Sequence, residues 1–227
     1  MLSVVVPTRN SEEGLARTLA SLVSAAAEGV VREVVVVDDG STDGTRIVAD
    51  AAGCTLVDGS GAWASRISLG IAAARRAPWF LLLAPDVFLD AEWFREASAF
   101  VDRIERSGRA DRAVATFRWA LDDFGWHARL AEHVVAMAEG LLAAPLGEQG
   151  LLISRAHWLR LAAAMPPDAG RGAVFAGLPR RAVHVLRADA VVLTPRDGET
   201  ATPSLGRLAR IALAGLGLPP PPDDERA

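Results

Sequence analysis

Apolar runs and polar loops alternate regularly through the first 95 residues of the chain. Four short apolar runs are each followed by a segment whose apolar positions recur at helical spacing. The predicted strands span residues 2–6, 34–37, 54–57 and 80–83, and Asn10 or Ser11 is expected to cap the first helix. Because these runs are continuously apolar, both faces of each strand are expected to be covered. The order of elements predicts an α/β fold with a mostly parallel, doubly wound sheet.

The second half of the chain has a less regular pattern. Helices are expected over residues 91–106, 126–143, 156–164 and 205–216, and strands over 113–118, 151–154, 183–186 and 190–193. The last two strands are expected at an edge of the sheet, and the Pro/Gly-rich segment 165–172 is expected to be a loop. We predict a single domain over residues 1–218, with halves that meet near residue 95, and a disordered tail over 219–227.

Polar residues gather where three of the predicted strands end. The first strand runs into Pro7-Thr8-Arg9-Asn10, the second into Asp38-Asp39-Gly40-Ser41, and the fourth into Pro85-Asp86. In open parallel sheets, ligands bind beyond the carboxyl ends of the strands, and these residues are expected to converge on that one edge. Tandem aspartates offer hydrogen-bond acceptors to a base or ribose, although a polar turn that caps a helix explains the second loop equally well on spacing alone.

Composition excludes several classes of function. The net charge of −4 argues against a general nucleic-acid binder, and all 24 basic residues are arginine, which rules out a Schiff base and a P-loop lysine. Cys54 is the single cysteine, so neither an internal disulfide nor a thiolate metal cluster is possible. No signal peptide is evident and no run of about 18 apolar residues occurs, so a cytoplasmic location is expected.

At this point the motifs resemble those of a known family. The segment SVVVPTRNSEEGLARTLASL, then EVVVVDDGSTDGT, then a strand ending near Asp86, is similar to the nucleotide-sugar-binding half of family 2 glycosyltransferases with the GT-A fold. This resemblance covers about residues 2–95 and makes 96–218 the acceptor-side half. The later segment GEQGLLISRAHWLRL resembles the GDQ-x-x-F-x-R-x-x-x-F segment of small bacterial transferases associated with radical-SAM and selenodomain gene neighbourhoods.

The resemblance implies a donor site and a chemistry. Relatives of this kind bind a nucleoside diphosphate sugar over the first strand ends and transfer the sugar to an acceptor with inversion. Matched to the motifs, Pro7, Thr8 and Asn10 would line the nucleotide pocket, and Asp38 and Asp39 would contact the base or ribose. The acceptor, the base and the sugar are not specified by these motifs, and neither is the oligomeric state.

The resemblance also implies a metal site. A divalent cation, Mg²⁺ or Mn²⁺, would neutralise the diphosphate leaving group, because a hard cation prefers oxygen ligands. Asp86 matches the last residue of the family's Asp-x-Asp motif, while Ala84 stands where the first acid would be. Arg66 lies where the family often has a residue facing the diphosphate, although a solvated helix arginine is an equal interpretation.

The expected acceptor-side base is missing from its usual place. The family generally carries Glu-Asp, often after Gly-Gly-Phe, whereas residues 162–181 here read AAAMPPDAGRGAVFAGLPRR. Asp168 lies close in sequence and could substitute, although it is more typical of a loop aspartate. Glu148, in GEQ, is the other candidate acid.

Four further hypotheses stay open on the sequence. A non-catalytic relative that only binds a nucleotide is compatible with the missing Glu-Asp. A nucleotidyltransferase has a related fold, but the first loop lacks the glycines and lysine that such enzymes use on phosphates. The helix at 205–216 could contact a membrane surface, although packing against the domain is the favoured interpretation. Trp119, Trp126 and Trp158 could line an acceptor cleft, with core packing favoured for at least two of them.

Overall fold

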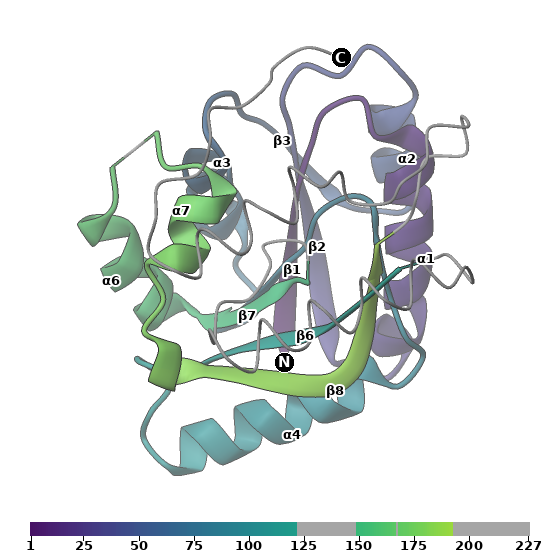
Figure 1. The fold of residues 1–227 in the computed structure, drawn as a ribbon. Helices are drawn as coiled ribbons and strands as arrows, with labels where there is room; N and C mark the ends of the chain where they lie inside the picture. Colours follow the sequence, from purple (N-terminus) through teal and green to yellow (C-terminus); the bar gives the residue numbers. More distant parts are fainter. Residues whose placement is uncertain (122–148, 167, 193–227) are drawn as a thin grey trace.

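The computed structural model describes residues 1–121, 149–166 and 168–192, which form one sheet with helices on both faces (Figure 1). The strands are β1 (Leu2–Thr8), β2 (Val31–Asp38), β3 (Thr55–Asp58), β4 (Trp79–Leu82), β5 (Val87–Leu89), β6 (Val114–Leu121), β7 (Leu151–Ser154) and β8 (Val183–Val192). The helices are α1 (Glu12–Ala27), α2 (Thr45–Ala51), α3 (Trp63–Ala73), α4 (Trp93–Arg106), α6 (Arg155–Ala164), α7 (Arg171–Ala176) and the 3₁₀ turn η1 (Arg180–Ala182).

The sheet order is β3-β2-β1-β4-β7-β6-β8-β5. β1 pairs in parallel with β2 and β4, and β2 pairs in parallel with β3, as the strand–helix alternation predicts. The continuously apolar β1 is buried on both faces: Val4 and Val6 point into one core and Val5 into the other. The first core lies under α1, α2 and α4, and the second under α3, α6 and α7. The predicted doubly wound α/β arrangement is therefore confirmed.

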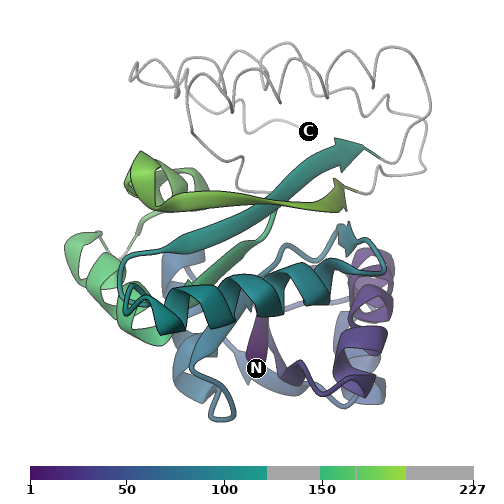
Figure 2. The same ribbon diagram turned by 90° about the horizontal axis from the view of Figure 1, so that it is seen from below.

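The second half of the chain adds strands to the sheet with both parallel and antiparallel pairing. β7 runs antiparallel to both β4 and β6, and β8 runs parallel to β6. α4 lies alongside β8, as both views show (Figure 1 and Figure 2). The predicted strands 113–118 and 151–154 correspond to β6 and β7, and the second has the predicted bounds.

The prediction of two edge strands at 183–186 and 190–193 was wrong. The structure has a single strand, β8, which lies between β6 and the short edge strand β5. The polar residues in the middle of β8 form an irregularity in its pairing with β6, not a turn. The Glu96 carboxylate on α4 accepts hydrogen bonds from the backbone N–H groups of Arg187 (2.6 Å) and Ala188 (3.1 Å), so the chain continues as a strand there.

Some sequence predictions fall on other parts of the chain. Glu148, Trp126, the helices at 126–143 and 205–216, and the tail at 219–227 lie outside the described residues. Among the residues that the structure describes, no helix is both long enough and apolar enough to cross a membrane.

Candidate functional site

The ends of β1 and β4 meet α3 and α7 around a pocket of about 370 Å³. Its described lining residues are Pro7, Arg9, Ser11, Trp63, Arg66, Ala84, Pro85 and Arg171. Parallel pairing of β1 with β2 and β4 brings the three predicted polar strand ends to this edge of the sheet. The convergence expected from the sequence therefore takes place.

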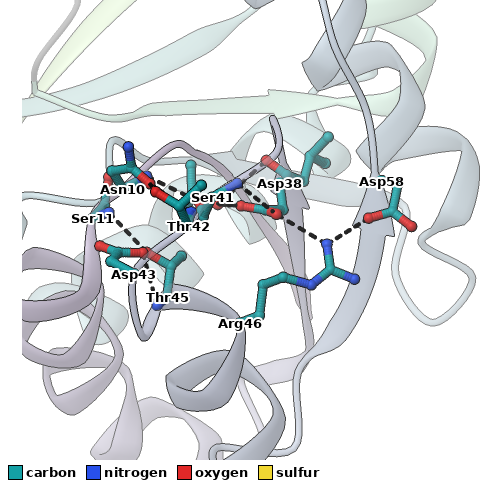
Figure 3. A network of polar contacts seen from close by, with 11 residues as sticks. Asn10, Ser11, Asp38, Ser41, Thr42, Asp43, Thr45, Arg46 and Asp58 are labelled. Carbon is teal, nitrogen blue, oxygen red and sulfur yellow. Dashed lines mark hydrogen bonds and ion pairs between the residues drawn. The ribbon is translucent and has the colours of Figure 1, made fainter.

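Asp38, at the end of β2, is buried and surrounded by hydrogen-bond donors (Figure 3). Its Oδ2 accepts from the backbone N–H of Ser41 (3.2 Å) and from the Arg46 guanidinium (2.9 Å), and its Oδ1 accepts from the Ser41 hydroxyl. Arg46 also donates to Asp58 at 2.5 Å, which ties the end of β2 to the end of β3. Both carboxylate oxygens of Asp38 are thus engaged within the protein, so this residue shapes the loop.

The electrostatics of Asp38 follow from these contacts. Burial alone would raise the pKa of its carboxyl, because a charge is poorly solvated in the protein interior. The hydrogen bonds from Ser41 and Arg46 outweigh that effect, so the pKa of Asp38 is lowered. Asp38 is therefore a stable carboxylate at neutral pH and holds the β2 end in one conformation.

Asn10 joins the end of β1 to the loop after β2. Its backbone adopts a left-handed conformation, with φ of 48°, which asparagine tolerates better than most residues. Its Oδ1 accepts from the backbone N–H of Thr42 (2.8 Å), and its own N–H donates to the Ser41 hydroxyl (2.9 Å). Asn10 therefore holds two loops of the site together, with its side-chain oxygen turned toward Thr42 (Figure 3).

A second set of contacts fixes the start of α1 against the same loop. Ser11 occupies the cap position but makes no side-chain capping bond; its N–H donates to the Thr45 hydroxyl at 2.8 Å. The Asp43 carboxylate accepts from the backbone N–H of Glu12 at 3.1 Å and so caps α1 from a different loop. The Glu12 carboxylate in turn accepts from the backbone N–H of Gly44 at 2.9 Å. These reciprocal bonds give the strand-end loops a fixed geometry.

Asp39 is placed differently from its neighbour. It is half-buried, and its closest described cation is Arg9, at 3.9 Å between Arg9 Nη1 and Asp39 Oδ2. Its carboxylate is therefore much less occupied than that of Asp38. Of the other predicted donor residues, Pro7 lines the pocket, whereas the Thr8 hydroxyl is buried and lies 3.5 Å from Asp38 Oδ1.

Arg66 reaches the pocket from α3. It is half-buried, and its Nε is shielded from solvent with no hydrogen-bond partner among the described residues. Trp63, one turn earlier on the same helix, lines the pocket beside it and packs against Trp158 at 6.4 Å and Phe175 at 6.2 Å between ring centroids. A guanidinium that is partly desolvated and beside an open pocket is suited to bind an anion.

Asp86 follows β4 directly after the pocket residues Ala84 and Pro85, and it is exposed. No described residue forms a hydrogen bond or an ion pair with its carboxylate, and the described residues contain no cluster of three His, Cys, Asp or Glu that could hold a metal ion. Mg²⁺ commonly binds one or two carboxylates together with substrate phosphates. A single exposed carboxylate therefore fits a cation that arrives with a phosphate ligand, and it does not form a preassembled metal cage.

Gly14 explains how this loop is positioned. A Cβ added to Gly14 would lie 2.7 Å from the backbone oxygen of Pro85 and 3.4 Å from Cα of Asp86. The first turn of α1 can therefore pack directly on the loop that carries Asp86 only because residue 14 lacks a side chain. Sequence reasoning missed this residue, since a single glycine in an early helical turn carries no sign of its tertiary neighbour.

The acceptor-side candidates do not gather at the pocket. Asp168 is exposed and is not among the residues that line it, and Glu148 lies outside the described residues. Trp158 is buried in the core beside α3, and Trp119 is also buried. Sequence reasoning did not single out Arg171, which lines the pocket from the first turn of α7. Its only sequence signal is its place beside Gly170 and Gly172, where the family motif was expected.

Comparisons with known proteins agree with this geometry. The glucosyl-3-phosphoglycerate synthase of Mycobacterium tuberculosis, in complex with Mn²⁺, UDP and glucosyl-3-phosphoglycerate, is 20% identical with a TM-score of 0.62; the match covers 96% of this chain and 81% of that one. The complex of that enzyme with Mn²⁺, UDP-glucose and phosphoglyceric acid is 19% identical with a TM-score of 0.59, covering 96% and 80%. No curated protein matches the sequence.

These structural likenesses show the fold, which is the GT-A fold predicted from the motifs. The sequence profile described as "Glycosyl transferase family 2" matches residues 3–133, which is more than half of the chain. That segment contains the donor-side strand ends, the pocket residues of α3 and the loop that carries Asp86. The chain therefore belongs to glycosyl transferase family 2.

Proposed function

We propose that the protein transfers a sugar from a nucleoside diphosphate sugar to an acceptor, with a divalent cation and with inversion at the sugar carbon. The observation that carries this proposal is a pocket at the ends of β1 and β4, with Arg66 on its wall and with Asp86 next to its lining residue Pro85. The end of β2 lies at the same edge of the sheet, because β2 pairs in parallel with β1. In the fold relative, Mn²⁺ or Mg²⁺ is present together with UDP, which supports the same combination here.

In this proposal the donor lies across the ends of β1 and β2. The half-buried Asp39 is better placed than Asp38 to accept a hydrogen bond from the base or ribose, because both oxygens of Asp38 are already engaged. Pro7 and Asn10 shape the nucleotide side of the site. Arg66 faces the diphosphate and stabilises the negative charge that grows on it as the sugar bond breaks.

Asp86 is the proposed ligand of Mg²⁺ or Mn²⁺, which would supply charge neutralisation to the diphosphate when bound. Ala84 has no side-chain oxygen, so we propose that the remaining ligands come from the diphosphate and water. The metal should accordingly bind with the nucleotide and not before it. We also propose that the chain is nearest to the radical-SAM- and selenodomain-associated transferases, which rests on the segment GEQGLLISRAHWLRL that contains Glu148.

A second candidate function is nucleotide binding without catalysis. It is favoured by a specific observation: among the described residues that line the pocket, none is a carboxylate that could serve as a base. Asp168 and Glu148 remain proposals for that role. Donor binding without transfer or donor hydrolysis, across a broad panel of acceptors, would favour this second function.

The deciding experiment is calorimetric titration with UDP- and GDP-sugars, each with and without Mn²⁺. We expect one nucleotide series to bind, and we expect Mn²⁺ to strengthen its binding about tenfold or more. Asp86→Asn should remove this enhancement. The control is Asp102→Asn, which changes an exposed aspartate away from the pocket, on α4, and it should leave the enhancement intact. Absence of binding by every donor would refute the transferase proposal. An unchanged Mn²⁺ effect in Asp86→Asn would refute the metal assignment alone.

A further inference from the structure

The pocket has an unusual charge balance. Three of its described lining residues are arginines, Arg9, Arg66 and Arg171, and none of the described lining residues is acidic. Arg9 is largely exposed, and its Nη1 lies 3.9 Å from Asp39 Oδ2, so the Asp39 carboxylate partly neutralises its charge. The pocket wall is therefore electropositive, which favours ligands that carry phosphate or carboxylate groups.

Arg66 gives an independent sign that this wall is built for a ligand. Its Nε is sealed from solvent and has no hydrogen-bond partner among the described residues. Leaving a donor of a charged group desolvated and unpaired is costly, and a bound anion would satisfy it. Because Arg66 belongs to the donor half, the donor diphosphate is its natural partner.

Arg171 belongs to the other half of the chain. It is the single described lining residue from beyond residue 95, and it lies on α7, where the family's acceptor-side motif was expected. α7 is held close to α3: the backbone N–H of Ala64 donates to the carbonyl of Ala169 at 3.1 Å, and Trp63 packs on Phe175. These contacts fix the first turn of α7 beside Trp63 and Arg66.

A guanidinium at this place cannot act as a base, because arginine keeps its proton at any physiological pH. Its five N–H donors in a planar fork match phosphate or carboxylate oxygens, and they allow it to hold a ligand together with a protein partner. The residue that the acceptor side presents to the pocket is thus an anion-binding group.

We propose that the acceptor substrate carries a phosphate or carboxylate group and that Arg171 binds this group, beside the donor diphosphate at Arg66. This inference rests on the proposed function and specifies its acceptor class. Two anions can lie side by side in the pocket because arginines separate them and lower their mutual repulsion. Trp63 also lines this pocket and gives it an apolar surface.

The test uses three small probes that share a carbon skeleton: glycerol 3-phosphate, glycerate and neutral glycerol. Each is titrated by calorimetry into the full-length protein saturated with UDP and Mn²⁺, and again into the protein alone. We expect binding of at least one anionic probe, with a Kd at least about tenfold below that of glycerol. The phosphate and carboxylate probes separately distinguish the two possible anionic groups.

Three variants separate anion binding from a structural role. Arg171→Gln should weaken the anionic probe about tenfold or more while leaving UDP affinity within about twofold, and Arg171→Lys should restore part of the lost affinity. Arg187→Gln, which changes an exposed arginine on β8, is the matched control and should bind the probe like the unaltered protein.

The outcomes separate this inference from the proposed function. If UDP binds but glycerol binds as well as the anions, or if Arg171→Gln leaves anion binding unchanged, the anionic acceptor is refuted and the transferase proposal stands. If UDP and the donors do not bind, the proposed function fails, while the titrations without nucleotide still support or refute an anion site at Arg171.

Discussion

Two aspartates at strand ends on the same edge of the sheet, Asp38 at the end of β2 and Asp86 after β4, have opposite surroundings. Asp38 is 1% exposed, and Ser41 and Arg46 supply donors to both of its oxygens. Asp86 is exposed and has no described hydrogen-bond or ion-pair partner. A buried carboxylate needs such partners to keep its charge, whereas an exposed one can leave water for a metal ion at little cost.

The acidic residues at this edge of the sheet therefore differ: some hold loops in place, and Asp86 keeps its carboxylate open to solvent. The loops after β1 and β2 are cross-linked by hydrogen bonds that involve Asn10, Asp38 and Asp43, so their shape is set before a ligand arrives. The loop after β4 is held by backbone packing on Gly14, which leaves the Asp86 side chain available. Preshaped loops beside a solvent-exposed carboxylate suit the proposed donor, which would bring its own cation.

The largest expected effect comes from removing the charge of Asp38. Asp38→Asn should lower the free energy of unfolding by about 2–3 kcal/mol, because the Arg46 and Ser41 donors then face a neutral amide. This loss of stability is at the lower end of the range for a buried ion pair, because the Arg46 side chain is 42% exposed and water replaces part of the lost contact. Urea unfolding followed by circular dichroism measures this change.

The adjacent Asp39→Asn is the matched control. It should change the free energy of unfolding by less than about 0.5 kcal/mol, since its closest described cation is 3.9 Å away on an exposed Arg9 side chain. It should instead weaken nucleotide binding. Equal loss of stability in the two variants would mean that the division between a structural Asp38 and a ligand-binding Asp39 is wrong.

Gly14→Ala tests the packing that positions Asp86. The new methyl group would lie 2.7 Å from the Pro85 backbone oxygen, so the loop or α1 must shift. We expect a loss of about 1–2 kcal/mol in unfolding free energy. Displacement of Asp86 should also reduce the Mn²⁺ enhancement of nucleotide binding. Calorimetric titration with UDP, with and without Mn²⁺, measures this second effect.

Gly172→Ala serves as the control for this packing, because a Cβ at Gly172 meets no atom within 4 Å. Its UDP affinity and Mn²⁺ enhancement should match those of the unaltered protein. If Gly14→Ala binds UDP and Mn²⁺ like the unaltered protein despite its lower stability, Gly14 has only a structural role.

Sequence reasoning predicted the parallel half of the fold well because its signals are local. Each apolar run ends at a proline or an aspartate, and continuous burial of β1 on both faces follows from the absence of alternation. It failed at β8, for which two separate strands were predicted on either side of residues 187–189. This part of β8 is held by carboxylates that are distant in sequence: Glu96 accepts from the Arg187 N–H, and Asp90 accepts from the Asp189 N–H at 3.0 Å. Partners so far away leave no local sequence pattern.

The candidate site shows the same limit. The strand-end residues could be predicted as a group, because parallel strands present their carboxyl ends at one edge. The difference between Asp38 and Asp39 could not, since it depends on the reach of Arg46 from α2. Arg171 enters the pocket only because α7 folds back onto α3, and its neighbours in sequence give no sign of that contact.

The smallest expected effect is a pH dependence of the stabilisation by Asp38. Hydrogen bonds hold the pKa of Asp38 below its ordinary value of 3.8 despite burial, so in acid the unfolded chain takes up this proton before the folded protein does. The stabilisation by Asp38 is therefore complete well above pH 3.8 and is lost as the pH falls below it. The difference in unfolding free energy between the unaltered protein and Asp38→Asn should shrink by up to about 1 kcal/mol between about pH 6 and about pH 3. Urea unfolding at a series of pH values tests this expectation, and a flat difference for Asp38→Asn would show that its hydrogen bonds do not favour the charged form.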